Sequence, residues 1–197
     1  MALISLLTIT YNSAATIQAT LDSIYAQSFQ DFEYIVVDGS STDETLSLIK
    51  EHPVKVHQMV SEPDGGLYEA LNKGIRLAKG EVVGMLHSDD AFYDDTSLQK
   101  IADIFEVGAD ACYGDLQYVI SAGLPGHDRV VRHWVAGEFK REKLKYGWMP
   151  PHPTFYMRRR LYDQFGGYDS SFRIAGDYDG LLRYLWKHEV VPAYIPE

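Results

Sequence analysis

The sequence Leu3-Ile-Ser-Leu-Leu-Thr-Ile9 is a short, nearly continuous apolar run, and polar residues follow it at once. A second run, Tyr34-Ile-Val-Val37, ends in the same way at Asp38. Apolar runs of this length with polar or small residues at their ends are typical of strands that are buried on both faces. Between the two runs, apolar residues recur at helical spacing over 17–25, behind Asn12-Ser13, which we expect to cap a helix. The chain therefore begins with a strand, a helix and a strand.

This alternation continues along the first half of the chain. The predicted elements are a helix over 43–49 opened by Asp43, a strand over 54–60, a helix over 67–78, a strand over 81–86 and a helix over 98–105 capped by Asp94-Asp95. Strands joined by helix-length segments predict a mostly parallel sheet with helices on both faces, because each crossover must pass over one face of the sheet. The predicted fold class is therefore α/β.

The second half of the chain is less regular. We expect strands over 112–120 and 130–135, separated by the turn-rich residues 122–127. At 197 residues with 46% hydrophobic content, the chain can bury one substantial core but is too short for two full-sized domains. We therefore predict one domain over 1–197, with a Rossmann-like half over about 1–110 and an added layer over about 111–197.

The charge is unevenly distributed. A net charge of −10 argues against a nucleic-acid-binding protein, which is normally basic. Residues 129–160 nevertheless hold nine of the eighteen Lys and Arg residues against two Glu, which gives this segment a charge of +7. It could be a solvated loop or helix face, or it could bind an anionic acceptor or the headgroups of an anionic membrane.

Composition also bears on location and on metal chemistry. No apolar run approaches the length of a membrane-spanning helix, and the first residues lack a basic leader and a cleavage site. We expect a cytoplasmic protein that is at most attached to the inner face of a membrane. The single cysteine, Cys112, leaves no partner for an internal disulfide and no thiolate cluster for zinc, so any metal must use oxygen or imidazole ligands.

Polar clusters lie where predicted strands end or predicted helices begin. They are Thr8-Ile-Thr-Tyr-Asn12, Asp38-Gly-Ser-Ser-Thr-Asp43, Ser88-Asp-Asp90 and Gly176-Asp-Tyr-Asp179. The first three follow parallel strands, whose carboxyl ends meet at one edge of a sheet, where ligands bind in α/β folds. Acidic residues far apart in the sequence are therefore expected to converge there.

Asp89 and Asp90 follow the predicted strand over 81–86. Mg²⁺ and Mn²⁺ are held by one or two carboxylates together with phosphate oxygens of the substrate. An Asp-Asp pair arises easily by chance in a chain this rich in Asp, so only its position at a strand end carries the inference. We predict Asp90 as a metal ligand, with Asp89 beside it.

The other acidic residues each have a structural alternative. Asp38 could accept hydrogen bonds from a base or a ribose, or it could be a helix cap, a role that Asp43 fits better. Asp64-Gly-Gly66 is typical of a turn. Asp177 and Asp179 begin an apolar-periodic segment, and only one of them is needed as its cap, which leaves the other for catalysis.

In this order and spacing, the clusters resemble the signature of the family 2 glycosyltransferases, whose catalytic domain has the GT-A fold. The matching segments are Leu7-Thr-Ile-Thr-Tyr-Asn12, Tyr34-Ile-Val-Val-Asp38 with 39–43, Glu62-Pro-Asp-Gly-Gly-Leu-Tyr-Glu-Ala-Leu-Asn-Lys-Gly74, the DXD-like Ser88-Asp-Asp90, and Gly176-Asp177. Together they cover nearly the whole chain.

The resemblance implies an inverting transfer of a sugar from a nucleotide diphosphate sugar, usually a UDP-sugar, with Mg²⁺ or Mn²⁺. It makes 1–110 the nucleotide-sugar half and 111–197 the half that holds the acceptor and the base. It also implies a saccharide or lipid-linked acceptor in cell-surface polysaccharide or glycoconjugate synthesis. By position, Asp177 would be the catalytic base and Asp90 the metal ligand. The implied substrate-binding residues are Thr10, Tyr11, Asn12, Asp38 at the base, Asp64 at the nucleoside, Asn72, Asp89 and, on the acceptor side, His152.

The chain departs from the family pattern at two positions and at its end. His87 stands where members often have an acid, which could alter the metal preference or place an imidazole behind the ligands. Gly176 stands where a Glu commonly precedes the base, so a helper is expected to be missing. The sequence stops at Ile195-Pro-Glu197 where relatives usually continue, which suggests a shortened chain.

Other classes fit the sequence less well. A sugar nucleotidyltransferase or a nicotinamide dehydrogenase would need a glycine-rich loop after the first strand, and Thr10-Tyr-Asn-Ser-Ala14 contains no glycine. A catalytically inactive module that binds a nucleotide sugar stays open, opposed only by the presence of Asp90 and Asp177.

Overall fold

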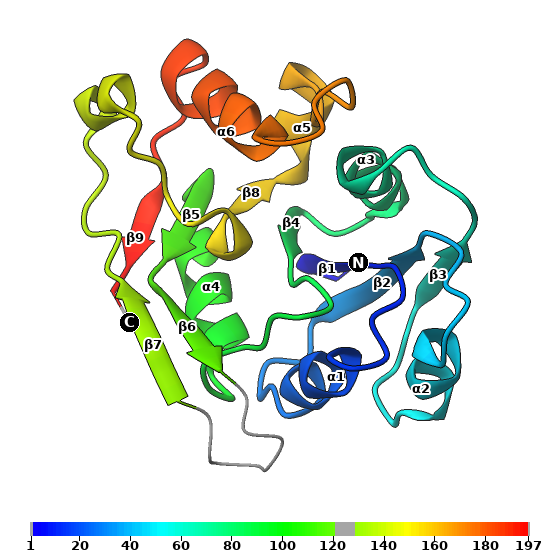
Figure 1. Cartoon of the computed structure of the whole chain (residues 1–197). Helices are drawn as coiled ribbons and strands as arrows, with labels where there is room; N and C mark the ends of the chain where they lie inside the picture. Colours follow the sequence, from blue (N-terminus) through cyan, green and yellow to red (C-terminus); the bar gives the residue numbers. More distant parts are fainter. Residues whose placement is uncertain (1, 121–128, 197) are drawn as a thin grey trace.

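The computed structural model describes residues 2–120 and 129–196, so the predicted turn over 122–127 lies outside it. Within these residues the centre of the molecule is a seven-stranded sheet (Figure 1). In sheet order the strands are β3 (Gln58–Ser61), β2 (Phe32–Asp38), β1 (Ile4–Thr10), β4 (Val82–Met85), β8 (Tyr156–Arg158), β5 (Ala111–Gly114) and β9 (Ala193–Ile195).

The sheet is mostly parallel, which confirms the predicted fold class. β1 pairs in parallel with β2 on one side and β4 on the other, and β3 continues the parallel set beyond β2. β8 runs antiparallel to both β4 and β5, whereas β9 is parallel to β5. The second half of the chain thus extends the sheet of the first half.

Helices cover both faces of the sheet (Figure 1). Leu7 and Ile9 of β1 pack into one core with α3, α5 and α6, and Ile4 and Leu6 pack into a second core with α1, α2 and α4. The helices are α1 (Ile17–Tyr25), α2 (Thr45–Glu51), α3 (Leu67–Leu77), α4 (Ser97–Glu106), α5 (Arg159–Phe165), α6 (Gly176–Leu181) with the π-helical continuation η3 (Leu182–Lys187), and the 3₁₀ turns η1 (Arg141–Tyr146) and η2 (His152–Thr154). Over the described residues, no helix has both the length and the apolar character needed to cross a membrane.

The strand predicted over 112–120 is two strands, so that prediction is wrong. The chain leaves the central sheet after β5 and enters a separate two-stranded ribbon of β6 (Leu116–Ile120) and β7 (Arg129–Trp134). Asp115 lies at the break, where its carboxylate accepts hydrogen bonds from the Ala136 N–H at 2.8 Å and the Tyr194 hydroxyl at 2.8 Å. A carboxylate with these partners stabilises the bend.

The helix starts agree only partly with the expected caps. The predicted cap of α1 by Asn12 and Ser13 is wrong, because no side chain caps that helix and the Asn12 amide oxygen accepts a hydrogen bond from the Thr42 N–H. Asp43 and Asp94 do bind backbone N–H groups at the starts of α2 and α4, at 3.0 Å in each case. Asn12 is thus used to join two loops.

A buried carboxylate joins the elements near the amino-terminal ends of the parallel strands. Glu33 of β2 accepts hydrogen bonds through Oε1 from the Ser5 hydroxyl at 2.5 Å and from the N–H groups of Lys79 and Gly80 at 2.5 and 3.0 Å. Burial by itself raises the pKa of Glu33, but these hydrogen bonds lower it further than burial raises it. Glu33 therefore holds β1, β2 and the start of β4 together as an anion.

We expect Glu33→Ala to lower the free energy of unfolding by about 2 kcal/mol at neutral pH, because it leaves buried donors without an acceptor. Since the pKa of Glu33 is depressed in the folded state, its contribution is present above the ordinary Glu range and is lost as pH falls through the folded pKa. The difference in the free energy of unfolding between the variant and the wild type should therefore become smaller at acidic pH. Urea unfolding measures it, with the exposed Glu106→Ala as a control; equal losses in both variants would contradict the role of Glu33.

Candidate active site

Hydrogen bonds join the loops that follow β1, β2 and β4 at one edge of the sheet. The Asn12 amide oxygen accepts a hydrogen bond from the Thr42 N–H at 2.8 Å, and the Asn12 N–H donates to the Ser41 hydroxyl at 2.8 Å. The hydroxyls of Ser13 and Ser88 lie 2.8 Å apart. The structure thus brings together three polar clusters that the sequence spreads over about 80 residues, as expected for the carboxyl ends of parallel strands.

Asp38 is fully buried and supports its own loop from within. Its Oδ2 accepts hydrogen bonds from the Ser41 N–H at 3.0 Å and the Ser61 hydroxyl at 2.6 Å, and its Oδ1 accepts one from the Ser41 hydroxyl. These contacts fix the turn after β2 and join it to the end of β3. The carboxylate predicted to bind a base is therefore used first of all to shape the loop beside it.

Tyr11 and Asp64 both lie close to the position where a side chain on Gly39 would begin. A Cβ on Gly39 would lie 3.0 Å from Asp64 Oδ2 and 3.4 Å from the Tyr11 ring. Asp64 Oδ1 accepts the Gly66 N–H at 2.9 Å, and Gly66 has a φ of 124°, which agrees with the turn predicted there. The Tyr11 side chain is 63% exposed. An exposed aromatic ring can stack against a nucleobase, and the carboxylate beside it can accept hydrogen bonds from that nucleobase.

Thr10 ends β1 opposite Asp38 in the sheet register. The residue is buried, and among the described residues its hydroxyl has no hydrogen-bond partner. A buried hydroxyl without a partner costs free energy, so its position at a strand end next to the loops is consistent with the predicted substrate contact.

The carboxylates of Asp89 and Asp90 differ in their surroundings. Asp89 is exposed and Asp90 is partly buried. Burial raises the pKa of Asp90 to about 6, the charge of Asp89 adds to this, and the backbone N–H of His87 partly offsets it. The backbone of Asp90 is held by its N–H, which donates to the His87 carbonyl, and by its carbonyl, which accepts the Thr20 hydroxyl at 2.7 Å.

This pair fits a hard divalent cation that is shared with a substrate. In the part of the chain that the structure describes, no salt bridge involves Asp90, so a cation would relieve its unfavourable charge. Within the same residues, no three His, Cys, Asp or Glu side chains form a group able to hold a metal. One or two carboxylates completed by phosphate and water is the arrangement that Mg²⁺ prefers.

His87 precedes Asp89 and Asp90 in the segment after β4. Burial lowers the pKa of His87, while the charges of Asp89 and Asp177 raise it, so both carboxylates are within electrostatic reach of one imidazole. The rings of His87 and His152 have centroids 6.1 Å apart. The charges of Asp89, in the loop after β4, and of Asp177, at the start of α6, therefore both act on His87. The expected convergence of Asp90 and Asp177 on one site stays a prediction.

His152 is buried beside the candidate base. Its Nε2 lies 3.0 Å from the Tyr168 hydroxyl. Burial lowers the pKa of His152 to about 4, the neighbouring His87 lowers it further, and the charge of Asp177 opposes this. The imidazole is therefore neutral at neutral pH and can exchange hydrogen bonds without adding a charge.

Asn72 has a structural contact where a substrate contact was predicted. Its Nδ2 donates to the Tyr168 carbonyl at 2.7 Å, and its Oδ1 accepts the Tyr168 N–H at 2.8 Å. A Cβ on Gly167 would lie 2.1 Å from Asn72 Oδ1, so the two segments touch closely. Both ends of the amide are bonded to the backbone of Tyr168, so Asn72 joins α3 to the chain before α6. The predicted substrate contact of Asn72 stays a prediction.

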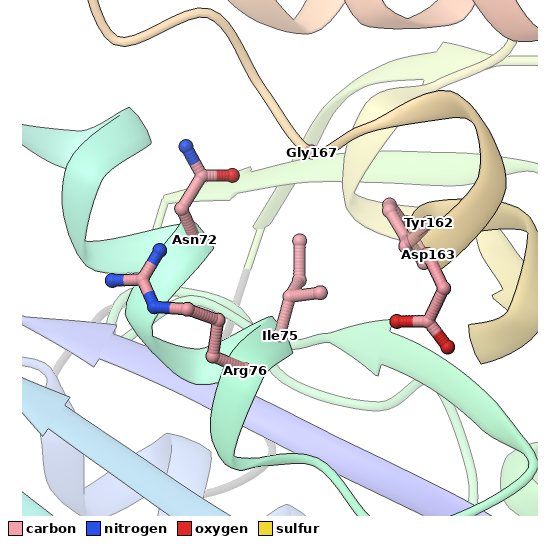
Figure 2. A pocket seen from close by; sticks show the side chains of 6 residues that line it. All are labelled: Asn72, Ile75, Arg76, Tyr162, Asp163 and Gly167. Carbon is pink, nitrogen blue, oxygen red and sulfur yellow. The ribbon is translucent and has the colours of Figure 1, made fainter.

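A cavity of about 270 Å³ lies between α3 and α5 (Figure 2). Its lining residues are Asn72, Ile75, Arg76, Tyr162, Asp163 and Gly167. Of the predicted site residues only Asn72 borders it, and the others of α3 that line it lie toward the end of the helix that points away from the loops. The cavity is thus separate from the site at the strand ends.

Tyr68 is the site residue that sequence reasoning missed. Its hydroxyl donates to Asp177 Oδ1 at 3.2 Å and accepts the Gly176 N–H at 2.8 Å. In the sequence it shares the apolar spacing of Leu71 and Ile75, which is typical of a core residue, and its ring is indeed buried. The only signal in the sequence was indirect: the residue before Asp177 is a glycine, which leaves room for another side chain to approach.

The chain is similar in sequence to known proteins over most of its length. Residues 5–174 match the family model described as Glycosyl transferase family 2. A PGL/p-HBAD biosynthesis glycosyltransferase of Mycobacterium bovis is 30% identical over 191 residues, which cover 94% of this chain and 71% of that protein. An uncharacterized glycosyltransferase of Mycobacterium tuberculosis is 31% identical over 189 residues, which cover 91% of this chain and 68% of that protein.

Solved structures share the fold. S. aureus TarS 1–349 superposes with a TM-score of 0.76 at 24% identity, and the match covers 99% of this chain and 58% of that one. The mannosyltransferase PcManGT from Pyrobaculum calidifontis, solved in complex with GDP-Man and Mn²⁺, gives a TM-score of 0.71 at 20% identity and covers 99% and 55%. The chain therefore has the GT-A architecture and spans little more than half the length of these two chains.

Proposed function

The chain belongs to glycosyl transferase family 2, and on that premise we propose that it is an inverting transferase that moves a sugar from a UDP-sugar to an acceptor hydroxyl. The observation that supports this proposal is the arrangement around His87 and His152, whose ring centroids lie 6.1 Å apart: the charge of Asp177 acts on both imidazoles, and that of Asp89 acts on His87. We take Asp89-Asp90 as the metal-binding pair and Asp177 as the base. A donor diphosphate and an acceptor hydroxyl must meet between two such groups.

On the donor side, the loops after β1, β2 and β3 would hold the nucleoside. Tyr11 offers an exposed ring and Asp64 a carboxylate, and both lie next to the space that the missing side chain of Gly39 leaves open. The three bonds that Asp38 accepts keep this loop in place before the donor arrives. A preformed loop saves the entropy of ordering it on binding.

Asp90, with Asp89 beside it, would hold Mg²⁺ or Mn²⁺. The bound cation would neutralise the charge that develops on the departing diphosphate. The chain's own contribution is to fix the backbone of Asp90 through His87 and Thr20, so that its carboxylate is presented at the end of β4.

Asp177 would remove the proton from the acceptor hydroxyl. Its Oδ1 is bound to Tyr68, and in the described residues no donor is bonded to its Oδ2. The free oxygen can therefore accept the acceptor's proton as the hydroxyl oxygen attacks the anomeric carbon from the face opposite the diphosphate. Such an attack inverts the configuration. The acceptor would be a saccharide or lipid-linked molecule of glycoconjugate or cell-surface polysaccharide synthesis.

We expect UDP binding to depend on Mn²⁺ and to lose that dependence in Asp90→Ala. Because the pKa of Asp90 is raised to about 6, protonation should weaken the Mn²⁺ effect in the wild type as pH falls through that value. Calorimetric titration of UDP with Mn²⁺ or with chelator, at pH 7.5 and pH 5.5, measures both effects. Asp95→Ala, in the other Asp-Asp pair, is the matched control. Equal affinity with and without chelator would remove the metal from the proposal.

We expect Asp177→Asn to keep the UDP affinity of the wild type and to lower turnover by about 10²-fold or more, because the amide cannot take a proton. A screen of nucleotide sugars for donor hydrolysis identifies the sugar and supplies the assay. Asp179→Asn, two residues along α6, is the control. Undiminished turnover in Asp177→Asn would refute its role as base, and UDP binding without turnover in any wild-type assay would favour the inactive binding module.

The basic segment over 129–160 could place the protein on a membrane. Several of its cations form ion pairs with the protein itself, among them Arg141 with Glu189 and Arg158 with Glu81, so its free positive charge is smaller than the sequence suggests. The exposed ribbon adds apolar Val131 beside the basic residues. We propose peripheral contact with anionic lipid through this segment and expect flotation with phosphatidylserine vesicles but not with phosphatidylcholine vesicles. Equal behaviour with both would leave only a solvated surface.

A further inference from the structure

The hydroxyl of Tyr68 binds two consecutive residues of α6 at once. It accepts the Gly176 N–H at 2.8 Å and donates to Asp177 Oδ1 at 3.2 Å. A phenol has one donor and two acceptor positions, so both bonds can exist together. Tyr68 is 6% exposed, which leaves its ring little freedom to turn away. One buried side chain therefore fixes both the backbone and the carboxylate at the start of α6.

Gly176 is required by this contact. A Cβ on residue 176 would lie 2.7 Å from Cε2 of the Tyr68 ring, closer than real Cβ contacts occur. The ring therefore occupies the space where a side chain at 176 would begin. The preceding Ala175 has a φ of 64°, a left-handed conformation that is costly for a residue other than glycine. The chain bends sharply before Gly176, and the Tyr68 ring and hydroxyl hold its backbone in place there.

We propose that Tyr68 is the positioning residue for the base: it holds Asp177 Oδ1 so that Oδ2 is turned toward the acceptor hydroxyl. This inference rests on the proposed function of Asp177. In the transfer, the acceptor O–H bond breaks and its proton passes to Asp177 Oδ2, while Tyr68 keeps its own proton. The acceptor oxygen bonds to the anomeric carbon, and the bond from that carbon to the diphosphate breaks with its electron pair.

The chemistry of the pair supports a donor role for Tyr68. Burial raises the pKa of Tyr68 above its ordinary value, more than the backbone N–H of Asp177 lowers it, so the phenol stays protonated at neutral pH. A hydrogen bond from a neutral donor to a carboxylate is stronger than one between neutral groups. The bond therefore orients the carboxylate and leaves it free to act as a base through its other oxygen.

The position of Tyr68 also links the base to the donor side. Tyr68 is in the first turn of α3, two residues after Gly66, whose N–H binds Asp64. Asn72 lies four residues further on, on the same side of the helix, and binds the backbone of Tyr168. A single helix thus carries the end of the nucleoside loop and the two contacts that hold the segment leading to Asp177.

Tyr68→Phe tests this role because it keeps the ring and removes only the hydroxyl. We expect turnover of the nucleotide sugar found by the hydrolysis screen to fall about 10- to 100-fold, with the donor KM and the UDP Kd changed by less than about twofold. Tyr184→Phe is the matched control, since it removes a buried hydroxyl that binds the Gly166 carbonyl and does not bind Asp177. An equal loss in both variants, or a loss seen in KM alone, would overturn the inference.

A double-mutant cycle separates this inference from the proposed function. If Tyr68 acts through Asp177, adding Tyr68→Phe to Asp177→Asn should change the residual turnover by less than about twofold. A further loss equal to that of the single variant would show an independent effect and overturn the inference. Should Asp177→Asn itself stay fully active, the proposed function fails instead.

Crystal structures of the wild type and Tyr68→Phe give a readout that needs no turnover. We expect the Asp177 carboxylate of the variant to leave its wild-type rotamer or to lose order, while the backbone of α3 and α6 superposes. An unchanged, equally ordered Asp177 in the variant would overturn the inference whatever the rates are.

Discussion

Parallel pairing of β1 with its two neighbours is the constraint on which the site depends. β1 is buried along all seven residues, so it cannot slip by one residue without turning each side chain to the wrong core. This register sets Thr10 beside Asp38 and aligns the end of β4 with the same edge. Loops that leave parallel strands in one direction must then share one side of the sheet. The convergence of Asn12, Ser41 and Ser88 follows from this pairing.

Two buried carboxylates, each with hydrogen-bond partners, hold the two ends of the parallel strands. At the end of the strands away from the site, Glu33 accepts hydrogen bonds from three donors in two parts of the chain, Ser5 and Lys79-Gly80. At the edge with the site, Asp38 does the same for the turn after β2. Asp90 differs, because its charge is destabilised by burial and by Asp89. A carboxylate whose charged form is destabilised in this way is typical of a ligand-binding or catalytic site.

The second half of the molecule brings the candidate base, Asp177, to its place by a different route. Among the described strands of the central sheet, only β8 is antiparallel to its neighbours; it lies between β4 and β5 and so joins the two halves of the sheet. The chain that follows crosses back over α3, where Asn72 and Tyr68 bind it at Tyr168 and Gly176. The position of Asp177 is therefore set by the contacts of its segment with α3, and not by the end of a strand.

The sequence by itself determined the parallel half of the fold and the residues gathered at its edge. Apolar runs followed by polar turns, as at Thr10, Asp38 and Asp90, report strand ends directly, because burial on both faces and the crossover geometry leave few alternatives. It could not distinguish one strand from two around Asp115, since the bend depends on donors about 20 and 80 residues further along the chain. Only the tertiary structure decided that Asn72 binds the backbone of Tyr168 and that Tyr68 binds Asp177. Both hydrogen bonds join segments about 100 residues apart in the sequence, and such a contact leaves no local sequence pattern.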